Sequence, residues 1–163
     1  MTAPSRVAEQ RYLQLGLGAR TAPVPLANYV PLVEYGGLAF TAGHGPLNDA
    51  GTAAFIGALG DEVSIHDGIK AAELTVKNLL VSLHTALGSL DRVAGVCQIR
   101  AYLRCVSGFD QHDQVLAAAS RLIVSVFGAD IGAHAATVIS VSECVLGLPV
   151  TIDGIFALEP LIL

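Results

Sequence analysis

The chain has 163 residues, 53% of them hydrophobic and only 14% charged, with a formal net charge of −5, and one domain of this size buries most of the surface that its unfolded chain exposes. An acidic chain without a basic cluster repels a phosphate backbone, which disfavours nucleic-acid binding, and no run of about 18 uncharged apolar residues predicts a transmembrane helix. Soluble domains are usually about 25% charged, so we expect subunit interfaces to bury the apolar excess.

The amino-terminal third of the chain predicts one short helix and then short strands. Residues 5–15 form a helix with Ser5 as its N-cap, and Pro23 and Pro25 make the next segment an extended connector. Two apolar runs on either side of Gly36-Gly37 have the pattern of a β-hairpin. A third short strand is expected within HGPLNDAGTAAF, after its turn residues.

The rest of the chain predicts two amphipathic helices and three strands. Ser64 begins a helix with the spacing of a capping box, and this helix ends near Gly88. The segment GVCQIRAYLRCV alternates as a strand with one covered face, formed by Cys97, Ile99, Ala101 and Leu103. A second helix runs from about residue 110 to 127, with Gly128 as its C′ residue, and AATVISVSEC and PVTIDGIFAL are the last strands. The order β-β-β-α-β-α-β-β predicts an α+β fold with one sheet covered on one face by two helices.

Few side chains have the spacing of a known catalytic or metal site. The histidines form no HxH or HExxH pattern and no Cys/His pair; they are His44, His66, His84, His112 and His134. There is no GxSxG, and the lone GxG of AGHGPL lacks the glycine of a dinucleotide fingerprint. We therefore expect no metal and no cofactor. Glu143 and Asp153 interrupt apolar strands, and an acid in that place is paired, exposed or functional.

The cysteines and the amino-terminus indicate the compartment. Cys97, Cys105 and Cys144 are odd in number and form no CxxC, which indicates free thiols in a reducing environment. The first residues, MTAPSRVAEQRYL, lack the apolar core of a signal peptide. We expect a cytoplasmic protein that is not inserted in a membrane.

Three segments in this order and spacing resemble the YjgF/RidA family, also labelled L-PSP endoribonuclease-like. They are NYVPLVEYGGLAFTAGHGPL, GSLDRVAGVCQIRAYLRCVSGFD and GAHAATVISVSECVLGLPVTIDGIFAL. The resemblance spans about Ala27 to Leu158. Residues 1–26 are then an added helix and connector, as in a longer subgroup of that family, and residues 27–163 are the family's domain.

The resemblance implies a chorismate-mutase-like fold and a homotrimer with small-molecule clefts between adjacent subunits. Well-studied members hydrolyse reactive enamine or imine intermediates to 2-oxo acids and ammonia, and they need no cofactor. An arginine binds the substrate carboxylate as a bidentate fork, and a glutamate positions or activates the attacking water.

Part of that cleft is kept in this sequence. The cleft tyrosine corresponds to Tyr29 and the turn glycine to Gly43, while His44 stands in place of the family's glutamine. His134 stands two residues before the position of the arginine, and an imidazole is the side chain best suited to acid–base chemistry near neutral pH. Glu143 lies where the longer subgroup often carries an acid. His134 and Glu143 are the catalytic candidates.

Three cleft positions of the family are lost. The asparagine of the second helix falls at Ala117, the arginine at Ala136 and the glutamate at Thr151, with Asp153 two residues later on the same strand face. Replacing the arginine with alanine removes charge-assisted hydrogen bonds of about 1.5–3 kcal/mol each. A carboxylate is therefore bound far less well by the family's route, unless His44, His134, Arg100 or Arg104 replaces the arginine.

Two functions stay open. One is a deaminase-like hydrolase of a small imine or enamine that has a non-canonical active site. The other is a ligand-binding or regulatory trimer that has lost this chemistry and holds an apolar or neutral metabolite. RNA cleavage rests on a family label alone, and both the pI of about 5.4 and the missing arginine disfavour it.

Overall fold

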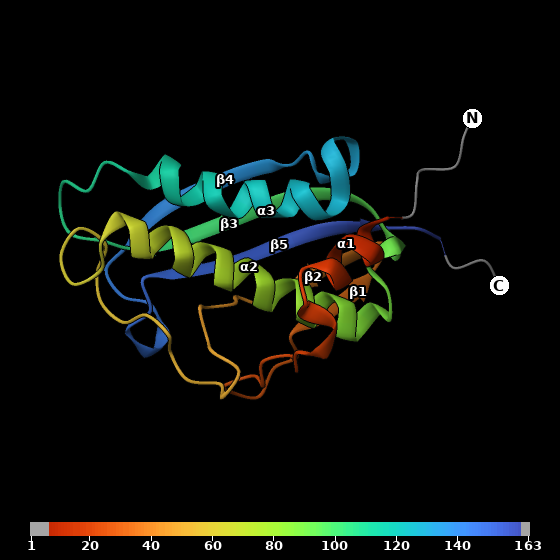
Figure 1. The fold of residues 1–163 in the computed structure, drawn as a ribbon, viewed down its shortest axis with the longest axis horizontal. Helices are drawn as coiled ribbons and strands as arrows, with labels where there is room; N and C mark the ends of the chain where they lie inside the picture. Colours follow the sequence, from red (N-terminus) through yellow and green to blue (C-terminus); the bar gives the residue numbers. More distant parts are fainter. Residues whose placement is uncertain (1–6, 161–163) are drawn as a thin grey trace.

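The structure is a computed structural model that describes residues 7–160 (Figure 1). Helices and strands follow one another along this part of the chain as α1 Ala8–Gln14, β1 Leu32–Tyr35, β2 Leu38–Thr41, α2 Ile65–Leu87, β3 Val93–Arg104, α3 His112–Gly132, β4 Ala135–Val141 and β5 Val150–Leu158. Short 3₁₀ turns cover Leu17–Ala19, Leu90–Arg92 and Val145–Gly147. The expected N-cap Ser5 lies outside the described residues.

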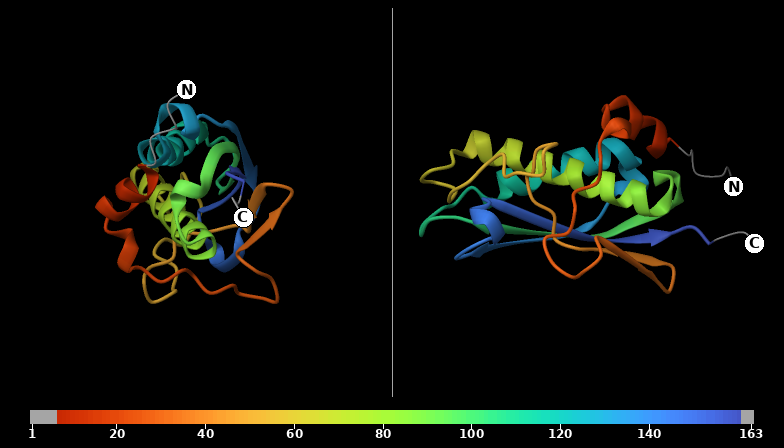
Figure 2. Two further views of the ribbon diagram at one scale, coloured as in Figure 1. Left: turned by 90° about the vertical axis from the view of Figure 1, so that its right-hand side faces the viewer. Right: turned by 90° about the horizontal axis from the view of Figure 1, so that it is seen from below.

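One mixed sheet carries the fold, in the order β1-β2-β5-β3-β4. β3 and β4 are parallel, with α3 as the crossover between them, and the other neighbouring strands are antiparallel. α2 and α3 lie on the same face of the sheet, as Figure 2 shows, and α1 packs against α3 at one end. The α+β fold with two helices on one face is confirmed.

The two long helices follow the boundaries that their sequences predict. The Ser64 hydroxyl accepts a hydrogen bond from the Asp67 N–H at 3.2 Å, and α2 ends at Gly88 in the left-handed conformation. Gly128, at φ 84°, interrupts α3 where the sequence predicted its end. α3 is long and apolar enough to cross a membrane, but its apolar side is core, with Ala118, Ala119, Ile123 and Val126 buried.

The third strand expected within residues 44–55 is wrong. This segment forms only single bridges, between His44 and Ile152 and between Leu47 and Ala53. The Asn48 side chain accepts hydrogen bonds from the N–H groups of Ala50 and Thr52 at 3.0 and 3.1 Å. A side chain that satisfies backbone donors in this way stabilises a turn instead of a strand ladder.

Cys97 also differs from its prediction, because it is exposed instead of buried. The pairing of β3 with β5 shifts between Val96 and Gln98, and a bulge of this kind interrupts the alternation of faces. Beyond the bulge, Ile99, Ala101 and Leu103 point into the core as expected; all three are at most 1% exposed.

The second face of the sheet carries no helix within residues 7–160 (Figure 2). Side chains of all five strands lie on it, because successive residues of a strand point to opposite faces of the sheet. The exposed apolar residues of this open face are Val33, Tyr35, Phe40 and Ile139.

Candidate functional site

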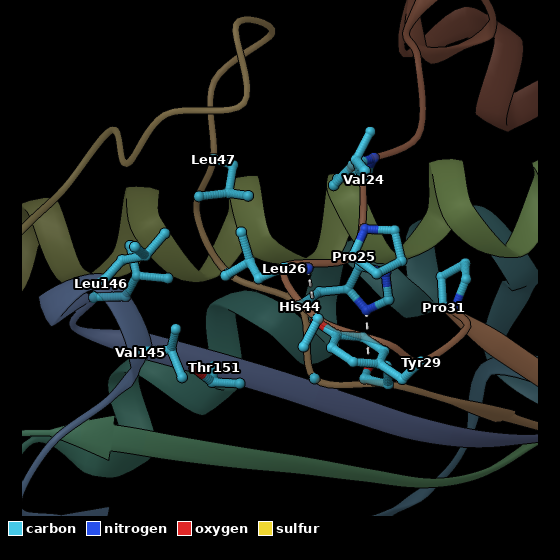
Figure 3. A pocket seen from close by; sticks show the side chains of 16 residues that line it. Val24, Pro25, Leu26, Tyr29, Pro31, His44, Leu47, Val145, Leu146 and Thr151 are labelled. Carbon is cyan, nitrogen blue, oxygen red and sulfur yellow. Dashed lines mark hydrogen bonds between the residues drawn. The ribbon is translucent and has the colours of Figure 1, made fainter.

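A pocket of about 490 Å³ lies beside the start of β5. Three segments enclose it: the connector of residues 23–31, the segment of residues 42–47 after β2, and the turn of residues 145–148. Figure 3 shows Val24 and Pro25 of the connector on one side of the pocket and Val145 and Thr151 on the other. The complete lining is Pro23, Val24, Pro25, Leu26, Ala27, Tyr29, Pro31, Ala42, Gly43, His44, Gly45, Leu47, Val145, Leu146, Leu148 and Thr151. It contains no Asp, Glu, Lys or Arg.

The segment of residues 42–47 is held between α2 and β5. The Asn78 amide on α2 donates hydrogen bonds to the carbonyls of Gly45 and Leu47, both at 2.9 Å. On the other side, His44 and Ile152 exchange backbone hydrogen bonds of 2.8 and 2.9 Å. The pocket floor is therefore fixed to the rigid part of the fold.

His44 is a buried, oriented imidazole in this floor; 7% of it is exposed. Its Nδ1 lies 2.8 Å from the Ala42 carbonyl and its Nε2 lies 2.8 Å from the Ser82 hydroxyl. Burial is the largest cause that lowers its pKa, so the ring is neutral near pH 7. A carbonyl only accepts, so Nδ1 carries the proton and Nε2 accepts from Ser82. Both nitrogens are then occupied.

The lowered pKa of His44 predicts acid destabilisation. The unfolded residue binds a proton near its ordinary pKa of about 6.5, above the pKa of the folded residue. The contribution of His44 to the free energy of unfolding is therefore fully present above about pH 6.5. It declines as the pH falls below that value, by up to about 1.4 kcal/mol per pH unit. His44→Gln keeps an acceptor for Ser82 without titrating, so its free energy of unfolding declines less between about pH 7.5 and 5.5. Urea unfolding at several pH values measures this, and parallel profiles for the two proteins would refute it.

Tyr29 and Thr151 supply the other polar groups of the pocket. The Tyr29 hydroxyl lies within 3.4 Å of the Leu26 N–H, so it also orders the connector. Gly43 lies so close to Thr151 that a Cβ on Gly43 would be 2.9 Å from the Thr151 methyl carbon. A glycine is thus required where the segment after β2 approaches β5.

Comparison with other proteins places this geometry in a family. No family model matches the chain. The chain is 32% identical over 159 residues to Protein TCP17 of Trypanosoma cruzi, covering 98% of both proteins. It is 31% identical to Atu1372 of Agrobacterium tumefaciens, a protein of unknown function, with a TM-score of 0.82 over 94% of this chain and 93% of that one.

Solved structures with lower identity share the fold. A candidate endoribonuclease of Shewanella oneidensis superposes with a TM-score of 0.86 at 24% identity, over 93% of this chain and 99% of that one. RidA of a Psychrobacter species superposes with a TM-score of 0.58 at 18% identity, over 84% of this chain and 94% of that one. The chain belongs to the YjgF/RidA family. Helix α1 is the extra amino-terminal helix expected of the longer RidA subgroup.

The expected RidA cleft residues divide into two groups in the structure. Four of them line the pocket, namely Tyr29, Gly43, His44 and Thr151. The others, Ala117, His134 and Ala136, lie in or beside α3 and β4. β3 separates β4 from β5 in the sheet, so one chain does not bring the two groups together.

His134 and Glu143, the catalytic candidates, both have partners outside the pocket. His134 Nδ1 lies 2.7 Å from the Gly132 carbonyl, and its Nε2 lies 3.0 Å from the Ser120 hydroxyl. Glu143 pairs with Arg104 at 3.0 Å on the surface. Neither residue lines the pocket.

The cations considered as replacements for the family's arginine are also paired. Arg100 Nε donates to Asp153 at 2.7 Å, and the Tyr102 hydroxyl donates to the other carboxylate oxygen at 3.1 Å. Burial, followed by Asp153, raises the pKa of Tyr102, so the phenol keeps the proton that it donates. Arg104 pairs with Glu143. Asp153 is thus part of an ion-paired cluster on the open face.

Sequence reasoning missed the apolar part of the site. Val24 and Leu26 of the connector and Val145 and Leu146 of the turn line the pocket, and all are exposed. Leu146 also has a φ of 60°, which is unusual for a residue other than glycine. The available signal was a run of large apolar residues in segments without strand or helix periodicity, where polar residues are usual.

Proposed function

We propose that this chain binds a small, uncharged and mainly apolar metabolite in its RidA-type cleft and does not hydrolyse carboxylated imines. The observation that carries the proposal is the lining of the pocket, which is apolar apart from Tyr29, His44 and Thr151 and has no charged side chain. Pockets of this size and character hold small ligands by burial, with a few polar groups that fix orientation.

The state of the candidate catalytic groups supports binding over catalysis. A general base needs a free lone pair within reach of the water that it activates. His44 uses both nitrogens, to Ala42 and Ser82, and His134 uses both, to Gly132 and Ser120. The positions of the family's arginine and glutamate are Ala136 and Thr151. RNA cleavage is disfavoured by the same lack of a cation in the pocket.

The proposal includes a homotrimer with the cleft between subunits. It is supported by the open face, where apolar side chains of β1, β2 and β4 are exposed, and by the separation of the pocket from Ala136 and His134. A second copy that presents its β4 edge to the pocket would unite the two groups. Light scattering at micromolar concentration tests this part, and a monomer would refute it.

A matched pair of substitutions tests the ligand site. Leu26 in the pocket and Leu13 on α1 are 56% and 53% exposed, so arginine is tolerated at either position. Nile red serves as a neutral apolar probe, and its fluorescence is titrated against each protein. We expect Leu26→Arg to weaken binding about tenfold or more, because a charge is placed in an apolar cleft, while Leu13→Arg leaves binding unchanged. Equal affinity for all three proteins would refute a ligand site here.

The same protein is then tested for deamination. An amino-acid oxidase generates 2-iminobutyrate in the assay, and ammonia and 2-oxobutyrate are followed. We expect the rate of the buffer alone. A faster rate would refute the binding proposal in favour of imine hydrolysis. The variant Ala136→Arg with Thr151→Glu restores the family's charged pair and shows whether its loss explains the inactivity.

A further inference from the structure

A cysteine, a serine and a histidine form a hydrogen-bonded chain away from the pocket. Cys105 follows the last residue of β3, His112 is the first residue of α3, and Ser140 lies in β4. The Cys105 thiol donates to the Ser140 hydroxyl at 3.2 Å, and that hydroxyl lies 2.7 Å from His112 Nε2. The sulfur is also 3.6 Å from the same Nε2. None of the three residues lines the pocket.

The geometry permits a proton to leave the sulfur. In the neutral state the thiol donates to Ser140, and Ser140 donates to the unprotonated Nε2 of His112. When one proton moves along this chain, the thiolate accepts from Ser140 and the imidazolium donates to Ser140. Both hydrogen bonds are thus kept with reversed direction, and a thiolate–imidazolium pair is formed.

The surroundings of the cluster hold the histidine in place. The Phe109 ring meets the His112 ring edge-on with centroids 5.0 Å apart. Cys105 and His112 are partly exposed and Ser140 is exposed, so a small reagent reaches the sulfur.

We propose that Cys105 is a nucleophilic thiol that reacts with small Michael acceptors such as α,β-unsaturated carbonyl compounds. The proton of Cys105 passes through Ser140 to His112. The sulfur electron pair then forms a bond to the β-carbon, and the π pair of the double bond moves to the α-carbon. The resulting enolate takes the proton back from His112, so the addition needs no further reagent.

The chain contains its own comparison thiols. Cys97 is more exposed than Cys105, and it makes no side-chain hydrogen bond within the described residues. Cys144 is partly buried, and burial raises the pKa of its thiol. If exposure alone decided reactivity, Cys97 would react first; if the Ser140–His112 chain decides it, Cys105 reacts first.

N-ethylmaleimide, a Michael acceptor, serves as the probe. The full chain is treated with less than one equivalent at neutral pH, quenched at increasing times and digested, and the cysteine peptides are quantified by mass spectrometry. We expect Cys105 to react about tenfold faster than Cys97. His112→Gln and Ser140→Ala are expected to lower the rate of Cys105 to that of Cys97 or below.

Two outcomes would overturn the proposal. One is that Cys105 of the unsubstituted protein reacts no faster than Cys97. This result would overturn the proposal whether the sulfur is not activated or is covered in an oligomer. The other is a Cys105 rate that neither substitution changes. The rates of Cys97 and Cys144 in the variants report folding, because unfolding would expose Cys144 and raise its rate. Ser140→Val is the alternative variant if alanine disturbs β4, because valine favours a strand and lacks the hydroxyl.

Discussion

Replacing Asn78 with alanine is expected to lower the free energy of unfolding by about 2–4 kcal/mol, which shifts the urea midpoint by about 1–2 M. Asn78 is 2% exposed, and its amide donates to the Gly45 and Leu47 carbonyls. The substitution leaves both carbonyls without this donor in a buried place. Alanine is the better helix former by about 0.5 kcal/mol, which offsets only a small part of the loss.

Asn48→Ala is the matched control. Asn48 also makes several side-chain hydrogen bonds, to Ala50 and Thr52, but it is exposed, so water replaces those bonds. Asn48→Ala is expected to lower the free energy of unfolding by less than about 1 kcal/mol. Nile red affinity should fall with Asn78→Ala and not with Asn48→Ala, because only the first releases the segment after β2. Equal costs for both variants would contradict this account of the pocket floor.

The fold could be predicted largely from local signals. The Ser64 cap, the break at Gly128 and the Gly36-Gly37 turn each fix a boundary by the conformation of one or two residues. The missing third strand and the exposed Cys97 could not be predicted in the same way. Both depend on contacts with distant residues, namely which groups bond the backbone after β2 and where β3 shifts its register against β5.

The site was only half predictable. Tyr29, Gly43, His44 and Thr151 were placed together by a resemblance, and the pocket lining contains all four. The connector and the Leu146 turn carry no periodic pattern, so the available signal was only the presence of large apolar residues where polar residues are usual. The roles of Arg100 and Arg104 could not be predicted either. Whether an arginine is free depends on its partner, and both partners lie at least 39 residues away in the sequence.

Arg100→Met is the second variant with a large expected effect. It leaves Asp153, which is 8% exposed, with the Tyr102 hydroxyl in place of its cation. Breaking a buried ion pair costs about 3–5 kcal/mol, but the Arg100 side chain is 43% exposed, so water already screens part of the attraction. We therefore expect a loss of about 1–3 kcal/mol in urea unfolding.

Two comparison variants separate the charge effect from lost packing. Arg104→Met breaks a pair whose acid, Glu143, is 68% exposed, and it should cost less than about 1 kcal/mol. Arg100→Met with Asp153→Asn removes the uncompensated charge and should be more stable than Arg100→Met alone. If the double variant is no more stable, the pair contributes through packing. If Arg100→Met leaves stability unchanged but weakens binding of a carboxylate such as 2-oxobutyrate, Arg100 serves the cleft in place of the arginine missing at Ala136. That result would refute both a structural role for the pair and a ligand without charge.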